Sequence, residues 1–208
     1  MHEDQYGWDT ICSLYYDSEN FDLIRRSIDK PVYKEKLRMR SYGVPSGDTR
    51  VYVELKKKYD KVVYKRRIAL TYDNAVDFLL KREMPSNLSV KDNQIAAELL
   101  YALNYYPLKP AMIVAYDRVA LYCDHDPALR ITFDTNIRSR YRDLDLSMGA
   151  HGAPVLEKGK YIMEIKVNGA MPLWLVRILR KLDITPGSFS KYGTAYKQKL
   201  GLVSIPTE

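Results

Sequence analysis

Cationic side chains occupy every second position of a strand-like segment near the start of this chain. The segment is 33–42, and the cations are Lys34, Lys36, Arg38 and Arg40. Alternate side chains of an extended strand point to opposite faces, so these four are expected to line one surface. Such a surface has the charge and the hydrogen-bond donors that a polyanion-binding site requires.

Four further segments add charged residues to faces of the same kind. These residues are Glu54 and Lys56 in 51–58, Arg118 beside Tyr116 in 111–122, Arg130 and Asp134 in 129–137, and Glu164 and Lys166 in 161–167. With the first segment they make eight basic residues against three acidic ones. Solvent-facing surfaces usually intersperse the two signs, so the bias indicates a bound counter-charge. The alternative for each segment is an ordinary half-buried strand whose polar face meets water.

Apolar periodicity and turn residues predict strands with helices between them. Strands are expected at 10–16, 33–42, 50–59, 61–70, 111–122, 129–137 and 161–167, and helices at 18–29, 73–83, 92–105, after Pro172 and from near Ser188. The segment 147–154 is expected to be a flexible connection. In the helix after Pro172, the residues expected to face inward are Leu175, Ile178, Leu179 and Leu182. The pattern predicts one α+β domain over 1–208, an antiparallel sheet of about seven or eight strands with helices packed outside it.

Composition limits the possible partners and compartments. The chain has 208 residues and a net charge of +7, which favours an anionic partner without distinguishing nucleic acid, a membrane surface and phosphate compounds. No uninterrupted apolar run approaches about 18 residues, so neither a membrane-spanning helix nor a secretory signal is expected. Cys12 and Cys123 lie in apolar strand patterns and are expected to be thiols, as in the reducing cytoplasm.

The usual phosphate and catalytic signatures are absent from the sequence. It contains no P-loop and no Gly-x-Gly-x-x-Gly, its three histidines lack metal-ligand spacing, and no order of residues indicates a protein nucleophile. A hard cation such as Mg²⁺ or Mn²⁺ needs only one or two carboxylates besides phosphate oxygens and water, and Glu54 and Glu164 are the best candidates. The alternative is a salt bridge from each of them to Lys56 or Lys166.

Five motifs occur in an order that resembles a known family. They are Tyr-Lys-Glu-Lys-Leu-Arg-Met-Arg-Ser-Tyr-Gly at 33–43, Val-Glu-Leu-Lys at 53–56, Arg-Ile-Thr-Phe-Asp-Thr at 130–135, Met-Glu-Ile-Lys at 163–166 and Phe-Ser-Lys-Tyr at 189–192. Together they resemble the catalytic domain of the vacuolar transporter chaperone (VTC) polyphosphate polymerases, in a bacterial relative. That domain belongs to the triphosphate tunnel metalloenzymes, which are related to CYTH-type triphosphatases. The resemblance covers roughly residues 10–197.

The resemblance implies a β-tunnel, or barrel, whose basic interior binds ATP, triphosphate or polyphosphate with a divalent metal, Mn²⁺ or Mg²⁺. The implied catalytic cations are Arg38, Arg40, Lys56, Arg118, Arg130 and Lys191; the implied substrate-binding residues are Lys36, Tyr116, Lys166 and Ser190; and the implied metal ligands are Glu164 and Glu54. The family begins with a strand that carries inward-facing charges, followed by a helix. Residues 1–9 lead almost directly to the first expected strand, so both elements are expected to be absent and one tunnel wall to be missing, which leaves a free strand edge.

Three functions follow from these features. The first is a nucleotide-dependent polyphosphate polymerase, since phosphoryl transfer depends on positioning and charge and needs no protein nucleophile. The second is a triphosphatase in the same tunnel, with water as the acceptor. The third is a polyanion-binding module without catalysis; specific nucleic-acid binding is not expected, and no protein partner is predicted.

Overall fold

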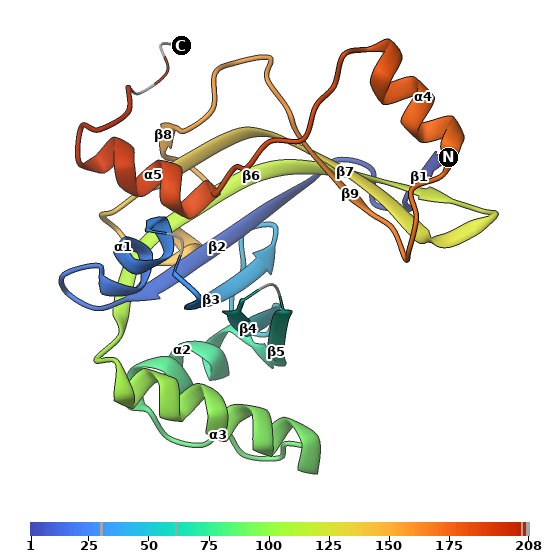
Figure 1. The fold of residues 1–208 in the computed structure, drawn as a ribbon. Helices are drawn as coiled ribbons and strands as arrows, with labels where there is room; N and C mark the ends of the chain where they lie inside the picture. Colours follow the sequence, from blue (N-terminus) through green and yellow to red (C-terminus); the bar gives the residue numbers. More distant parts are fainter. Residues whose placement is uncertain (30, 61, 205, 207–208) are drawn as a thin grey trace.

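The computed structural model describes all residues except 30, 61, 205, 207 and 208. Its strands form one antiparallel sheet in the order β5-β4-β3-β2-β6-β7-β8, with β1 paired to β6 and β9 paired to β7 (Figure 1). The strands are β1 (His2–Glu3), β2 (Asp9–Asp17), β3 (Tyr33–Tyr42), β4 (Arg50–Tyr59), β5 (Val62–Thr71), β6 (Lys109–Cys123), β7 (Asp126–Arg140), β8 (Ala153–Pro154) and β9 (Ile162–Lys166). The helices are α1 (Asp22–Ile28), α2 (Tyr72–Lys81), α3 (Val90–Tyr105), α4 (Leu173–Lys181) and α5 (Lys191–Lys199), with a 3₁₀ turn η1 at Leu146–Met148.

The predicted α+β class with an antiparallel sheet is confirmed, but the sheet is open. Among the described residues, β5 pairs only with β4, and β9 pairs only with β7. The two long edges therefore do not join into a closed tunnel wall. The sheet instead forms a curved platform with one basic face, described below.

The helices cover both faces of the sheet, and strand alternation decides which residues meet which helix. On the outer face α2 and α3 pack against β3–β5, and α4 packs against β7 and β9. On the inner face α1 and α5 pack against β2 and β6 (Figure 1). In β3, for example, Leu37 and Met39 are fully buried toward α2 and α3, while Arg38 between them points to the inner face. Burying each such apolar side chain stabilises the fold by about 1.5–3 kcal/mol.

The predicted element boundaries differ from the observed ones in several places. Toward their common turn, β6 ends one residue later and β7 begins three residues earlier than predicted. Lys61, the predicted start of the strand at 61–70, lies outside the described residues. The prediction that Ile178 and Leu182 face inward was wrong, because they are 46% and 61% exposed. Only Leu175 is buried and Leu179 partly buried, since α4 contacts the sheet along a narrow strip.

The segment 147–154, predicted to be a flexible connection, is held by two arginines of β7. Arg138 donates a hydrogen bond to the carbonyl of Ala150, and Arg140 donates to the carbonyls of Gly149 and His151 at 2.7 and 3.0 Å. The segment then forms β8, which pairs with β7. These contacts bring the backbone of residue 152 directly against the backbone of β7.

Gly152 is the residue at this close approach, and Gly152→Ala is expected to destabilise the protein. A Cβ at this position would lie 2.5 Å from the carbonyl oxygen of Ser139 and 2.7 Å from its carbonyl carbon, so backbone would have to move. We expect the free energy of unfolding to fall by about 1–3 kcal/mol, as in other overpacked sites. Urea denaturation measures this change. Gly187→Ala is the matched control, because no atom lies within 4 Å of its added Cβ; an equal loss in both variants would contradict the steric explanation.

Candidate functional site

Three lysines lie side by side on the inner face of the sheet. Strand register places Lys36 of β3 opposite Lys56 of β4, and Lys56 opposite Lys65 of β5. Like charges directly opposite each other on neighbouring strands are destabilising. Burial lowers the pKa of Lys36, and the adjacent cations Lys34 and Lys56 lower it further. Lys65 pairs with Glu54, 2.8 Å away, so an anion that bound at Lys36 and Lys56 would offset the repulsion that remains in the row.

The next row along the same strands surrounds one buried carboxylate. Glu54 lies between Arg38 and Arg67 in register and is almost fully buried. Its Oε2 is 2.7 Å from Nη2 and 2.8 Å from Nε of Arg38, and its Oε1 is 2.8 Å from Nζ of Lys65. Burial alone would raise the pKa of Glu54, but Arg38, Arg40 and Lys65 lower it to about 2. Glu54 is therefore ionised and serves to hold the three cations in place.

A second carboxylate organises the other half of the inner face. Asp134 of β7 accepts two hydrogen bonds from Arg118 of β6, at 2.5 and 2.8 Å, and its Oδ2 is 2.5 Å from Nζ of Lys191. Burial would raise the pKa of Asp134, but Arg118 and Lys191 hold it below its usual value. Both cations also lie over the ring of Tyr116, at 5.2 and 4.5 Å from its centroid. The sequence places Lys191 far from the other two, and only the fold brings the three together.

Helix α5 is fixed over this face by a buried carboxylate at the end of β2. Asp17 accepts hydrogen bonds from the backbone N–H groups of Ser18, Leu23 and Ile24 and from the hydroxyl of Tyr192, which is 2.9 Å away. Burial raises the pKa of Asp17. Asp17 joins the start of α1 to Tyr192 in the first turn of α5. It therefore fixes the position of Lys191, the residue before Tyr192.

The first residue outside α5 is also part of the site. Ser190 caps the helix by accepting a hydrogen bond from the N–H of Gly193 at 3.1 Å, and Lys36 donates a second hydrogen bond to the same hydroxyl at 3.1 Å. Two residues after Ser190, Tyr192 stacks on Tyr15 of β2, with ring centroids 4.3 Å apart. The cap therefore links α5 directly to the lysine row of the sheet.

The far end of the inner face carries Glu164 of β9. Glu164 lies opposite Thr132 in register, and Lys166 lies opposite Arg130. Oε1 of Glu164 is 3.4 Å from Nζ of Lys166, and the Glu164 side chain is 48% exposed. Arg130 also lies over Tyr122, at 5.1 Å from the ring centroid.

Several buried polar atoms on this face have no hydrogen-bond partner among the described residues. They are Oγ of Ser13, Nε of Arg40, Nε of Arg130 and Oγ1 of Thr132. Buried polar groups are almost always paired, so a set of unpaired groups on one face indicates a ligand or water that completes them. Three of the four residues, Arg40, Arg130 and Thr132, belong to the sequence motifs.

The carboxylates differ in how well they suit a divalent metal. The described residues contain no group of three or more His, Cys, Asp or Glu that could hold an ion by themselves. Glu164 fits Mg²⁺ or Mn²⁺, because it is exposed to the face and such ions accept one carboxylate together with phosphate oxygens and water. Both oxygens of Glu54 already face cations, which favours an ion pair, but its partners are Arg38 and Lys65 and not the expected Lys56. The metal role of Glu54 stays a prediction.

The structure brings all twelve implied catalytic, substrate-binding and metal-binding residues onto one face and adds two residues that the sequence analysis missed. The predicted residues on this face are Lys36, Arg38, Arg40, Glu54, Lys56, Tyr116, Arg118, Arg130, Glu164, Lys166, Ser190 and Lys191. The missed residues are Lys65 and Arg67 of β5, the latter over the ring of Tyr52 at 4.5 Å. The same two-residue alternation that revealed β3 would have found them.

Comparison with known proteins agrees with this architecture. The family model described as the VTC domain matches residues 2–200. The chain belongs to the VTC domain family. The resemblance inferred from the five motifs is thereby confirmed.

Relatives of this VTC domain include the vacuolar transporter chaperone complex subunit 4 of two trypanosomes. The Trypanosoma brucei brucei protein is 27% identical and the Trypanosoma cruzi protein 24% identical, each over 88% of this chain. The chain spans only 27% of the length of these curated relatives.

A solved structure supports the fold of the VTC domain. A Bacillus halodurans protein with a provisional adenylate cyclase designation has a TM-score of 0.50 at 15% identity, over 90% of this chain and 81% of its own. At this identity the likeness shows the fold alone. In the part of the chain that the structure describes, no helix is long and apolar enough to span a bilayer.

Proposed function

We propose that this VTC domain binds ATP and polyphosphate on its basic inner face and catalyses metal-dependent transfer of a phosphoryl group to a growing polyphosphate chain. The observation that carries the proposal is the row formed by Lys36, Lys56 and Lys65, in which Glu54 pairs with Lys65 and an extended polyanion would offset the remaining repulsion between Lys36 and Lys56. Membership of the VTC family supports the same ligand class.

The side chains of the inner face would act by position and charge. Arg38 and Arg118 present planar guanidinium groups, which match phosphate oxygens with two parallel hydrogen bonds. Their carboxylate partners Glu54 and Asp134 fix them before substrate arrives, so little reorganisation is needed when charge develops on the transferred group. Glu164 would hold Mg²⁺ or Mn²⁺ together with phosphate oxygens, and such an ion neutralises charge on the transferred phosphoryl group.

The open sheet supports a second candidate, a triphosphatase. β5 and β9 do not pair with each other among the described residues, and the side chains of Lys65 on β5 and Glu164 on β9 are 45% and 48% exposed, so water reaches the inner face at both edges. Water could then replace the polyphosphate end as acceptor at the same residues. Free phosphate as the product would identify this activity, polymer would identify the polymerase, and tight binding without turnover would identify a polyanion-binding module.

The compartment is proposed from the cysteines. Cys12 and Cys123 are both free thiols in the structure. Free thiols persist in reducing compartments. We infer the cytoplasm as the site of this domain.

Arg38→Ala tests the proposed function. We expect the dissociation constant for tripolyphosphate to rise about tenfold or more, because a charge-assisted bidentate contact is lost. Polyphosphate production from ATP and Mn²⁺ is expected to fall at least as far. Isothermal titration calorimetry measures the first quantity, and a polymer-specific assay measures the second.

Arg66→Ala is the matched control for Arg38→Ala. Arg66 is a neighbouring arginine on the opposite face of β5, where it forms an exposed salt bridge with Glu98 at 3.0 Å. The control is expected to bind and turn over substrate as the unchanged protein does. If a folded Arg38→Ala protein, verified by circular dichroism, also retained full affinity and product formation, the inner face would not be the site.

A further inference from the structure

A cavity of about 270 Å³ opens off the inner face at its lysine-rich end. It lies between α1, the first residues of β3 and the first turn of α5. Its lining is Ile24, Ser27, Ile28, Lys34, Lys36, Ser188, Phe189, Ser190, Gly193, Thr194 and Lys197. This lining contains three lysines and several hydroxyl groups but no aspartate or glutamate, so it has the chemistry of an oxyanion site.

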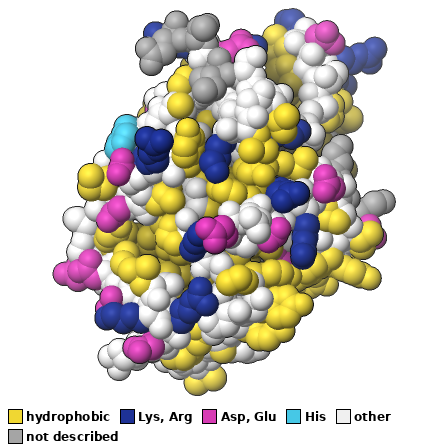
Figure 2. All heavy atoms as spheres, turned by 90° about the vertical axis from the view of Figure 1, so that its left-hand side faces the viewer, with side chains coloured by type: hydrophobic (Ala, Val, Ile, Leu, Met, Phe, Trp, Pro, Cys, Tyr) yellow, Lys and Arg dark blue, Asp and Glu magenta, His cyan; other side chains and the backbone are white. Residues whose placement is uncertain are grey.

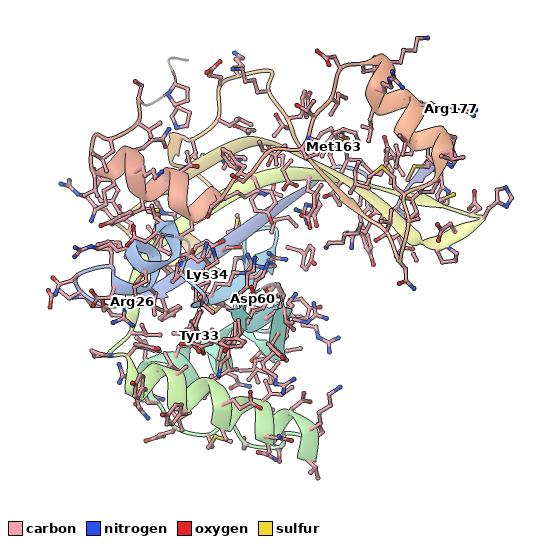
Figure 3. All side chains as sticks on the ribbon, in the orientation of Figure 1. Arg26, Tyr33, Lys34, Asp60, Met163 and Arg177 are labelled. Atoms are coloured by element: carbon pink, nitrogen blue, oxygen red, sulfur yellow. The ribbon has the colours of Figure 1, made fainter. Side chains whose placement is uncertain are left out.

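The three lysines of the cavity come from two elements, Lys34 and Lys36 from β3 and Lys197 from α5. Lys36 belongs both to this cavity and to the lysine row of the sheet, so the two spaces are continuous at Lys36. Lys34 donates to the carbonyl of Ser27 at 3.5 Å, and Figure 3 shows it on the side of β3 toward α1, opposite to Tyr33. Lys197, half-buried on α5, forms no ion pair with any described residue. Figure 2 views the side of the molecule that carries α1 and α5, where Lys and Arg side chains are spread among hydrophobic ones.

On β3 and β5, lysines and arginines are segregated along the inner face. On β3 the order from the α1 end is Lys34, Lys36, Arg38, Arg40, and on β5 Lys65 precedes Arg67 in the same direction. The planar guanidinium group of arginine fixes phosphate oxygens in one geometry, whereas the lysine ammonium is a compact point charge on a flexible side chain. Arginines therefore suit the reacting triphosphate. Lysines suit a chain whose successive phosphates must move past them.

We propose that the distal phosphates of a bound polyphosphate chain occupy the cavity between α1 and α5, with Lys197 as a chain-length-sensing contact. This inference rests on the proposed function and adds the direction of the chain: the arginine rows hold the reacting end, and the acceptor chain extends past Lys36 toward Lys34 and Lys197. Separate inorganic phosphate has the same oxyanion chemistry, and the experiment distinguishes the two sources.

Lys197→Ala tests the proposal through the length of the ligand. The affinity for a long linear polyphosphate is expected to fall about fivefold, because one charge-assisted phosphate contact is lost, while the affinity for tripolyphosphate changes less than twofold. The slope of log affinity against log salt concentration for the long chain is expected to decrease by about one in magnitude, as for the loss of one phosphate-contacting cation. Calorimetric titrations at several salt concentrations give both quantities.

Lys199→Ala is the control, since Lys199 lies two residues further along α5 and contacts the ring of Phe21 at 3.9 Å instead. Equal losses for both ligands in Lys197→Ala, or no loss for either, would overturn the proposal. Inorganic phosphate should also be titrated into the protein with the long chain already bound. If it then released heat in the unchanged protein but not in Lys197→Ala, the cavity would be a separate phosphate site and the proposal would be overturned. If tripolyphosphate failed to bind the unchanged protein, the proposed function itself would fail, a result distinct from these.

Discussion

Glu54→Gln is expected to lower the free energy of unfolding at pH 7 by about 3 kcal/mol, since removing one partner of a buried ion pair leaves the other charges uncompensated. The carboxylate of Glu54 lies within 2.8 Å of both Arg38 and Lys65 and 3.8 Å from Arg40. Glutamine keeps the shape of the side chain and removes only its charge. Urea denaturation at pH 7 measures the loss.

The pH dependence of this stability has a definite sign. The pKa of Glu54 is about 2 in the folded protein, below its ordinary value of 4.5. A carboxyl whose pKa is lowered by folding stabilises the protein above the unfolded pKa, and this stabilisation disappears as the pH falls through the folded pKa. The unchanged protein should therefore lose the contribution of Glu54 between pH 4.5 and about 2, and Glu54→Gln should lack that component. Glu98→Gln, at an exposed salt bridge, should retain it.

Ligand binding by the same variant separates the two interpretations of Glu54. If Glu54 only balances Arg38, Arg40 and Lys65, tripolyphosphate should bind Glu54→Gln more tightly than the unchanged protein without metal, and it should restore part of the lost stability. An anion would then replace the missing negative charge. If instead stability at pH 7 were unchanged and the Mn²⁺ requirement of binding or turnover were altered, Glu54 would be a metal ligand.

Local alternation accounts for the part of the site that could be predicted. The two-residue period placed Lys36, Arg38 and Arg40 on one face of β3 because side-chain direction in a strand depends only on position along it. The same rule applied to Val62–Thr71 would have added Lys65 and Arg67. What no local rule supplies is the pairing of Asp134 with Lys191, since the two meet only after α5 folds back across β6 and β7.

The fold could be predicted at the level of class and could not be predicted at its edges. Strand patterns show which face of a strand is apolar, but the neighbour of an edge strand depends on long-range packing, so the open sides of β5 and β9 emerged only from the structure. The same limit explains α4. Its apolar residues indicate a helix, yet they do not reveal that the helix contacts the sheet along one narrow strip, which leaves Ile178 and Leu182 exposed. Arg177 of the same helix also points away from the sheet (Figure 3).

Glu164→Gln is expected to reduce Mn²⁺-dependent turnover about a hundredfold, because the cation loses the charged ligand that positions it against the phosphate oxygens. Tripolyphosphate binding without metal should survive or become tighter, since one negative charge has left a polyanion site. Glu164 is one of the groups that raise the pKa of Arg118. Without its charge Arg118 should remain ionised, because the bidentate contact with Asp134 also raises that pKa. The arginine part of the site should therefore stay intact.

Titration of Mn²⁺ against activity in both proteins decides whether Glu164 is a metal ligand. A ligand role predicts that the variant needs a much higher Mn²⁺ concentration for half-maximal activity and stays slower at saturation. A role limited to the salt bridge with Lys166, 3.4 Å away, predicts a small change in stability and the same Mn²⁺ dependence as before. Glu157→Gln, at a comparably exposed salt bridge to Lys160 outside the inner face, controls for the loss of a surface carboxylate. An unchanged Mn²⁺ dependence in Glu164→Gln would rule out Glu164 as a metal ligand.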